Sequence, residues 1–203
     1  MSSARPTLGS LAEALESGRT SGRELVEACL ANIAAPGGEG ARAFIEVDAD
    51  GARAAAERQD KLRAEGRAPS PLAGVPISIK DLFDVKGHRT RAGSRVLNDA
   101  PLATEDAPAV ARLRAAGLLF VGRTNMTEFA FSGLGLNPHY GTPRNAWRRD
   151  EGAIPGGSSS GAAISVGDGM AHAGIGTDTG GSCRIPAAFN GLVGWKPTAR
   201  RVP

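Results

Sequence analysis

Two clusters rich in glycine and serine most constrain how this chain can fold. Residues 156–161 read GGSSSG, and residues 177–182 read TDTGGS. Glycine lets the backbone adopt positive φ and lets other groups approach it closely, at a cost in conformational entropy. Because the chain places glycine beside serines twice, we expect two loops that contact other groups. Gly and Ser also dominate ordinary turns, so neither cluster decides the matter alone.

Helix and strand patterns alternate along the chain. Ser10 and Ser21 each have a glutamate three residues later, the pattern of a capping box, and Asp50 and Asp106 precede two further helical segments. Such alternation predicts an α/β layer architecture. Helices are expected at residues 10–18, 21–35, 52–65, 106–116 and 162–173, and strands at 44–47, 77–80, 118–121 and 173–176.

One expected strand ends at a lysine. Ile77 and Ile79 alternate with Ser78 and Lys80, which is the period of a half-buried strand. Of the four lysines in the chain, Lys80 has the most apolar local sequence. A solvated lysine is the usual outcome at the end of a strand, so the residues alone leave the role of Lys80 open.

Composition argues against several classes of function. Hydrophobic residues make up 41% and charged residues 22% of the 203 positions, as in ordinary globular proteins. The net charge is only +3 and no long basic run is present, so we expect no direct binding of nucleic acid. Cys29 and Cys183 lie far apart and form no metal-ligand spacing. Since no His/Asp/Glu cluster is present either, no metal or cofactor is expected.

The sequence also predicts a cytoplasmic protein. No apolar run approaches the length of a membrane span. The first ten residues, MSSARPTLGS, lack the apolar segment of a secretory signal. We therefore expect neither membrane association nor export.

Longer motifs surround the two clusters. They are GGSSSG at 156–161, GTDTGGS at 176–182, RIPAA at 184–188 and GWKPT at 194–198, with 24 residues from Ser158 to Ser182. This region resembles the signature region of the amidase signature family, serine hydrolases that use a Ser-Ser-Lys triad. The segment PISIKD around Lys80 also resembles the one that carries the family's catalytic lysine.

The resemblance implies a fold. It implies an α/β/α architecture in which helices cover a mixed central sheet, with the C-terminal part of the domain absent. Residues 1–203 would then be the N-terminal portion of a single amidase domain. Within it we expect a helical N-terminal region at 1–70 and a catalytic core at 71–203, with the signature region at 155–198.

The resemblance also implies a role for each matching residue. Ser182 would be the nucleophile, Lys80 the base, and Ser158, preceded by a cis peptide bond from Gly157, the proton relay between them. The backbone N–H groups of Thr179, Gly180, Gly181 and Ser182 would form the oxyanion hole. Supporting roles fall to Ser159, Asp178 and Arg184, and a helix opened by residues 124–131 would line the substrate pocket near Ala130.

A lysine base must be uncharged to accept a proton. Its reference pKa is about 10.4, and burial without a carboxylate partner lowers that value. Asp81 follows Lys80 directly, and its charge would keep the lysine protonated. We therefore expect the Asp81 side chain to point away from Lys80.

The implied activity is hydrolysis of a carboxamide C–N bond through an acyl-enzyme, with release of ammonia or an amine. A small-molecule amide would be the substrate. The protein would form a homodimer or assemble with the partner subunits of an amidotransferase. The same resemblance covers the amidase (glutaminase) component of the glutamyl-tRNA amidotransferase complex. That context is the alternative within the family.

Three other hypotheses come from the residues themselves. GSSSG at 157–161 fits GxSxG, which would make Ser159 the nucleophile with His172 and Asp168 downstream. Cys183 raises the possibility of a thiol nucleophile with His172 as its base. A non-catalytic module in which the glycine-rich loops bind a small anion belongs to a different functional class.

Overall fold

A four-stranded mixed sheet organises the protein. The structure, a computed structural model, describes residues 5–202. The strands follow the order β1-β3-β2-β4, with β2 parallel to both β3 and β4 and β1 antiparallel to β3. This confirms the expected mixed sheet. The strands are β1 (Phe44–Val47), β2 (Pro76–Lys80), β3 (Leu119–Thr124) and β4 (Ala173–Ile175).

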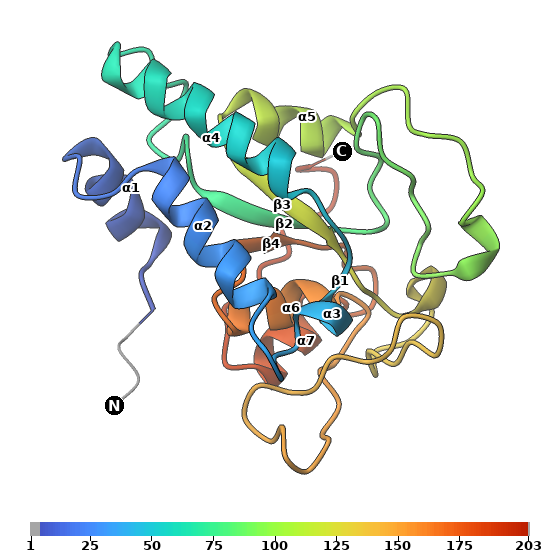
Figure 1. The fold of residues 1–203 in the computed structure, drawn as a ribbon. Helices are drawn as coiled ribbons and strands as arrows, with labels where there is room; N and C mark the ends of the chain where they lie inside the picture. The colour runs from blue at the N-terminus through green and yellow to red at the C-terminus, as the bar shows by residue number, and fades with distance from the viewer. Residues whose placement is uncertain (1–4, 203) are drawn as a thin grey trace.

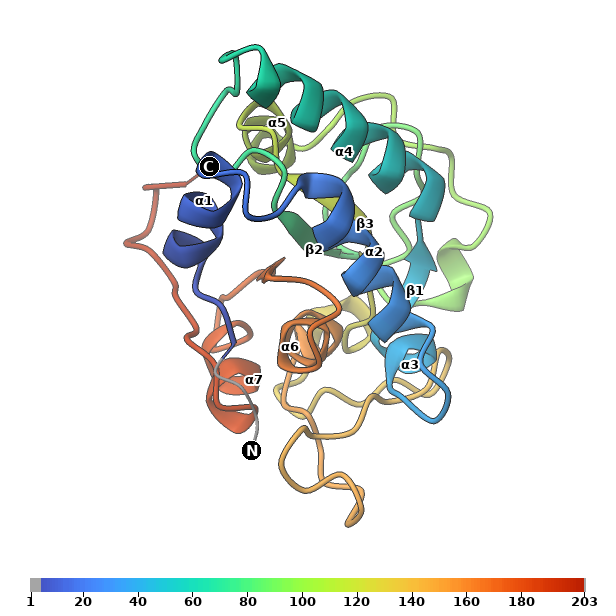
Figure 2. The same cartoon turned by 60° about the vertical axis from the view of Figure 1, so that its left-hand side comes forward.

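Helices lie on both sides of this sheet. Figures 1 and 2 show α4 and α5 above the strands and α6 and α7 below them, which confirms the α/β/α architecture. No helix in the described part of the chain has both the length and the apolar character of a membrane span. The helices are α1 (Leu8–Glu16), α2 (Gly22–Ile33), α3 (Gly40–Ala43), α4 (Ala49–Ala64), α5 (Pro108–Ala115), α6 (Ser160–Gly167) and α7 (Arg184–Phe189), with 3-10 turns at Arg95–Leu97 and Glu128–Ala130.

The central strand β2 is buried along its whole length. The expectation of a half-buried strand was wrong, because β3 and β4 pair with its two edges and packed side chains cover both faces. Ile77 and Ile79 join a hydrophobic cluster with residues of α1 and α5. Ser78 is buried too, and its hydroxyl is hydrogen-bonded to that of Ser165 at 2.8 Å. Lys80 is therefore fully buried, with 0% exposure.

Capping by Ser21 was predicted correctly, but two other helix starts were misplaced. Ser21 accepts the N–H of Glu24 in a complete capping box. The first helix is capped by Thr7 rather than by Ser10. The Thr7 side chain accepts the backbone N–H of Ser10. Similarly, Asp48 rather than Asp50 caps α4. Both caps lie two or three residues upstream of the expected ones, because two polar residues lie close together there and only one can accept from the first free N–H groups.

Asp106 does not cap α5, although Pro108 lies in the first turn as expected. Its carboxylate instead accepts the backbone N–H of Lys86 at 2.8 Å and pairs with Arg114. Tertiary partners thus outcompete the local capping position.

The helix expected from residues 124–131 is absent. Strand β3 continues to Thr124, and only the 3-10 turn at Glu128–Ala130 follows. Phe129 and Ala130 have φ of 49° and 60°, which an α-helix does not accommodate. Phe129 is 51% and Phe131 is 93% exposed, so neither belongs to the described core. The helix expected at 162–173 also ends early, at Gly167.

A buried ion pair lies immediately beside Lys80. The Asp81 carboxylate accepts two N–H groups of the Arg123 guanidinium at 3.2 and 3.3 Å, and the backbone N–H of Arg91 at 3.2 Å. Burial raises the pKa of Asp81, and the positive charge of Arg123 opposes that rise. The expectation that Asp81 points away from Lys80 is confirmed. Within the described residues 5–202, Asp81 forms its ion pair with Arg123 and none with Lys80.

Removing the cation from this pair should destabilise the protein strongly. Arg123→Met leaves the Asp81 carboxylate buried without its partner, which typically costs about 3–5 kcal/mol. The free energy of unfolding, measured with urea, should fall by that order. The loss should be smaller in mild acid than at neutral pH, because protonation of Asp81 removes the unpaired charge.

Arg148→Met serves as the matched control. Arg148 pairs with Glu151 where both side chains are largely exposed, so the free energy of unfolding should barely change. Equal losses for the two variants would show that the buried pair has no special role in stability.

Candidate active site

The parallel pairing of β2 and β4 brings distant loops to Lys80. Ile79 is in register with Ile175, so the two strands end at the same edge of the sheet. Lys80 is the last residue of β2, and residues 176–183, called here the Ser182 loop, follow β4. Residues 156–160, called here the Ser158 loop, lead into α6 at the same edge.

Two hydroxyl groups contact the amine of Lys80. Its Nζ lies 2.7 Å from Ser158 Oγ and 2.7 Å from Thr177 Oγ1. Lys80 and Ser158 are both fully buried. Burial lowers the pKa of Lys80 to about 8, although the negative charge of Asp178 partly opposes this effect. At pH 7 about a tenth of the amine is then uncharged, compared with less than ~0.1% for a lysine of ordinary pKa.

The Ser158 loop is held tightly by backbone contacts. The Gly157–Ser158 peptide bond is cis, as the resemblance implied. The Gly157 N–H donates to the carbonyl of Gly133 at 2.7 Å, and the Ser158 carbonyl accepts the N–H of Thr127 at 3.0 Å. A Cβ at position 157 would lie 2.6 Å from the backbone nitrogen of Gly135, so only glycine fits there.

Ser182 lies next to the Ser158 loop. Its carbonyl accepts the N–H of Ser159 at 3.2 Å, and the residue is half-buried. Within residues 5–202 the Ser182 hydroxyl makes no hydrogen bond to Ser158 or to any other group. The two loops are thus adjacent, but the direct Ser182–Ser158 hydrogen bond of the expected triad is not formed. Such bonds are often long before a substrate binds.

Asp178 holds the Ser182 loop in shape. Its carboxylate accepts the backbone N–H groups of Gly181 at 2.8 Å and Cys183 at 3.1 Å, and pairs with the Arg184 guanidinium at 2.9 and 3.0 Å. The Asp178 side chain is only 2% exposed. Arg184 and these amides hold the pKa of Asp178 well below its usual range, so the carboxylate stays charged at neutral pH.

The hydrogen bonds of Asp178 occupy one of the four backbone N–H groups expected in the oxyanion hole. The N–H of Gly181 is used by Asp178 and does not face an open site in this conformation. In the described part of the chain, the N–H groups of Thr179, Gly180 and Ser182 donate to no protein acceptor. Three of the four amides are therefore available to a bound oxygen.

The remaining expected residues surround the same two loops. The Ser159 hydroxyl donates to the carbonyl of Thr177 at 3.4 Å, which links the Ser158 loop to the Ser182 loop. Ala130 is half-buried in the 3-10 turn, and its N–H donates to the carbonyl of Thr127. Because Thr127 also binds Ser158, this turn is tied to the Ser158 loop.

A family model described as Amidase matches residues 24–203. This chain belongs to the amidase signature family. A glutamyl-tRNA(Gln) amidotransferase component from Anaeromyxobacter dehalogenans (strain 2CP-C) is 52% identical over 90% of this chain and 36% of its own length. A protein of the same description from Cupriavidus taiwanensis is 46% identical over 97% of this chain and 38% of its own.

Solved amidase structures have the same fold. The native peptide amidase from Stenotrophomonas maltophilia superposes with a TM-score of 0.83 at 36% identity, over 92% of this chain and 39% of that one. A bacterial aryl acylamidase of the amidase signature family gives 0.81 at 33% identity, over 90% and 37%. The chain thus spans less than two fifths of the length of these relatives.

The geometry of this amidase-family chain does not provide a histidine triad. Asp168 pairs with Arg149 at 2.8 and 2.9 Å rather than with His172. Among residues 5–202 no hydrogen bond joins His172 to Ser159 or to Cys183, and burial lowers the pKa of this histidine. Burial also raises the pKa of the Cys183 thiol, which disfavours the reactive thiolate.

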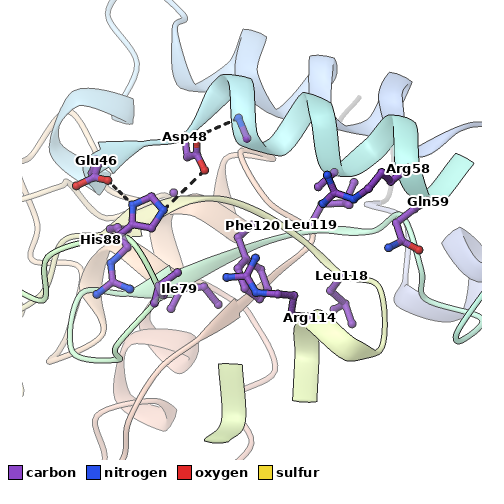
Figure 3. A pocket seen from close by; sticks show the side chains of 15 residues that line it. Glu46, Asp48, Arg58, Gln59, Ile79, His88, Arg114, Leu118, Leu119 and Phe120 are labelled. Carbon is purple, nitrogen blue, oxygen red and sulfur yellow. Dashed lines mark hydrogen bonds and ion pairs between the residues drawn. The ribbon is translucent and has the colours of Figure 1, made fainter. Parts of the chain in front are cut away.

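The expected site residues do not line the cavity on the other side of the sheet. Residues 5–202 contain no group of three or more His, Cys, Asp or Glu side chains placed to hold a metal ion. A cavity of about 70 Å³ lies on the side of the sheet that carries α4 and α5, and Figure 3 shows the side chains that line it. There His88 is hydrogen-bonded to Glu46 at 2.6 Å. None of the residues with an expected catalytic role lines this cavity.

One contact at Lys80 was missed by the sequence analysis. Thr177 was noted as part of the second cluster but received no role. Its place two residues after β4, which is parallel to β2, is the signal that could have identified it.

Neutralising Asp178 should loosen the Ser182 loop. Asp178→Asn replaces one acceptor oxygen with an N–H₂ group that faces backbone donors, so the free energy of unfolding should fall by about 1–3 kcal/mol. The folded-state pKa of Asp178 is depressed, so its stabilisation is present above the ordinary value of 3.8 and is lost as the pH falls below it. Urea denaturation across this pH range measures the difference.

Asp150→Asn is the matched control, because Asp150 is exposed. The control should leave stability nearly unchanged throughout. If the stability difference between the Asp178 variant and the unaltered protein did not shrink as the pH fell below 3.8, the charge would not be the cause.

Proposed function

We propose that this chain carries the catalytic residues of an amidase that hydrolyses a carboxamide C–N bond. Ser182 is the nucleophile, Ser158 the proton relay and Lys80 the base. The observation that carries the proposal is the 2.7 Å contact between Lys80 Nζ and Ser158 Oγ. It joins a buried amine of lowered pKa to a hydroxyl beside the Ser182 loop.

The proton steps follow from this geometry. Ser182 Oγ attacks the carbonyl carbon while its proton passes to Ser158 Oγ, and the proton of Ser158 passes to Lys80 Nζ. The N–H groups of Thr179, Gly180 and Ser182 then support the negative oxygen. The same proton returns through Ser158 to the leaving nitrogen, the C–N bond breaks, and ammonia or an amine departs. Water hydrolyses the Ser182 ester by the same relay.

A fluorophosphonate probe tests the nucleophile in the complete protein. Mass spectrometry should find the label on Ser182, with loss of fluoride. The non-catalytic anion-binding hypothesis instead predicts no label. Label on Ser159 that disappears in His172→Ala would support the GxSxG alternative, whereas our proposal expects His172→Ala to react normally.

The pH dependence of labelling tests the base. Only neutral Lys80 accepts a proton, so the labelling rate should rise with pH and reach half its maximum near the pKa of about 8. Lys80→Met should lower the rate by about 100-fold or more and abolish this rise.

Lys86→Met is the control, because Lys86 is an exposed lysine of the neighbouring loop. It should retain both the labelling rate and the pH profile. A normal profile in Lys80→Met would contradict the proposed base.

A second candidate function is that of the glutaminase component of an amidotransferase complex. It is favoured by relatives described as components of glutamyl-tRNA(Gln) amidotransferase at 44–52% identity. Ammonia release from glutamine, compared with release from benzamide, distinguishes the two candidates. Copurification with a tRNA-binding partner would support the complex, and a homodimer would favour the free amidase. A small-molecule amide is the substrate in both cases, and the cytoplasmic location stays a prediction.

A further inference from the structure

The amine of Lys80 has two hydroxyl neighbours at the same distance, and the triad uses only one. Ser158 Oγ and Thr177 Oγ1 both lie 2.7 Å from Lys80 Nζ. Ser158 is the relay proposed above. Thr177 has no role in that mechanism, although its contact with the amine is equally short.

The bonding geometry of Lys80 Nζ suggests a role for Thr177. A neutral amine has two N–H donors and one lone pair in tetrahedral directions, and rotation about the Cε–Nζ bond interchanges them. To take a proton from Ser158, the amine must point its lone pair at Ser158 Oγ. Thr177 Oγ1, at 2.7 Å, can then accept one of the two N–H groups.

We propose that Thr177 is a positioning residue, whose Oγ1 accepts an N–H of Lys80 and so turns the lone pair of the neutral amine toward Ser158. The inference rests on the base role proposed above for Lys80. Once the amine is protonated, Thr177 accepts the same N–H while Ser158 accepts another. The amine therefore keeps one orientation through the whole proton cycle.

The fold holds Thr177 in this place. Strand β4 runs parallel to β2, and Thr177 follows it by two residues. At Gly176 an added Cβ would lie 2.5 Å from Ser159 Oγ and 2.9 Å from Cys183 Sγ, so the backbone before Thr177 packs directly on both loops. The carbonyl of Thr177 also accepts the Ser159 hydroxyl. As a β-branched residue, threonine has a stiff χ1, which suits an acceptor of fixed direction.

The opposite hydrogen bond would have the opposite effect on Lys80. If the Thr177 hydroxyl donated to the lone pair, it would stabilise the neutral amine and block its approach to Ser158. As an acceptor, Thr177 instead favours the charged amine. Removing the hydroxyl should therefore lower the pKa of Lys80 if Thr177 accepts, and raise it if Thr177 donates.

The test measures Lys80 directly in the complete protein. Thr177→Val removes the acceptor and keeps the shape of the side chain, and Thr177→Ala is a second variant if valine disturbs the loop. The ¹³C NMR signal of Lys80 Cε, identified by its loss in Lys80→Met, is followed against pH. Its pKa should fall by about one unit, because the charged amine loses a hydrogen-bond acceptor. Asp178, whose charge also acts on Lys80, is unchanged in this variant.

Labelling of Ser182 by the fluorophosphonate probe gives the second readout. In Thr177→Val the rise of the rate should move to lower pH, yet the maximal rate should fall by about 10-fold or more, because the lone pair is no longer aligned. General damage to the loop would lower the rate without moving the pKa downward. Thr177→Ser keeps an acceptor and should restore both values.

Thr20→Val is the matched control, because the Thr20 hydroxyl contacts Glu24 near the start of α2. It should leave the Lys80 pKa and the labelling rate unchanged. An unchanged or raised Lys80 pKa in Thr177→Val, or an unaltered maximal rate, would overturn the inference. A lowered pKa without any labelling of Ser182 in the unaltered protein would refute the proposed function but not the hydrogen bond from Lys80 to Thr177.

Discussion

Burial of one amine without a carboxylate partner is the constraint on which this structure depends. Charged groups are rarely buried alone, because desolvation penalises the charged form. The fold meets this constraint by placing Lys80 at the end of a fully buried strand, where two hydroxyl groups receive its N–H donors. The adjacent Asp81 would restore the charge, but Arg123 engages it elsewhere. The pairing of Asp81 with Arg123 and the lowered pKa of Lys80 are thus two parts of one arrangement.

Close backbone packing brings the hydroxyl groups to this amine. Side chains are absent at Gly157 and Gly176, where an added Cβ would meet neighbouring atoms at 2.6 and 2.5 Å. The loops can therefore approach each other through their main chains, as the bond from Ser159 N–H to the Ser182 carbonyl shows. Asp178 then fixes the second loop through its amides. The glycines of these motifs therefore allow close contact between backbone segments as well as turns of the chain.

The alternation of helix and strand patterns predicted an α/β layer architecture. The mixed sheet, the α/β/α layering, the role of the segment around Lys80 and the cis bond before Ser158 came from the resemblance, because contacts between residues far apart in sequence leave no local pattern. Local rules failed where tertiary partners competed, as at Asp106, and where two polar residues offered the same cap. Full burial of β2 was missed because the alternation of apolar and polar residues reflects only that strand. It does not reveal the strands and helices that cover it. Thr177 was missed because its contact depends on strand register.

The partners of Lys80 lie 78 and 97 residues further along the chain. Before the strands pair, this lysine is an ordinary solvated cation with a pKa of about 10.4, and the serines are ordinary alcohols. Any reactivity that depends on the neutral amine is therefore withheld until translation has passed Thr177 and β4 has docked. Unfolded copies therefore lack the neutral amine that the proposed reaction requires.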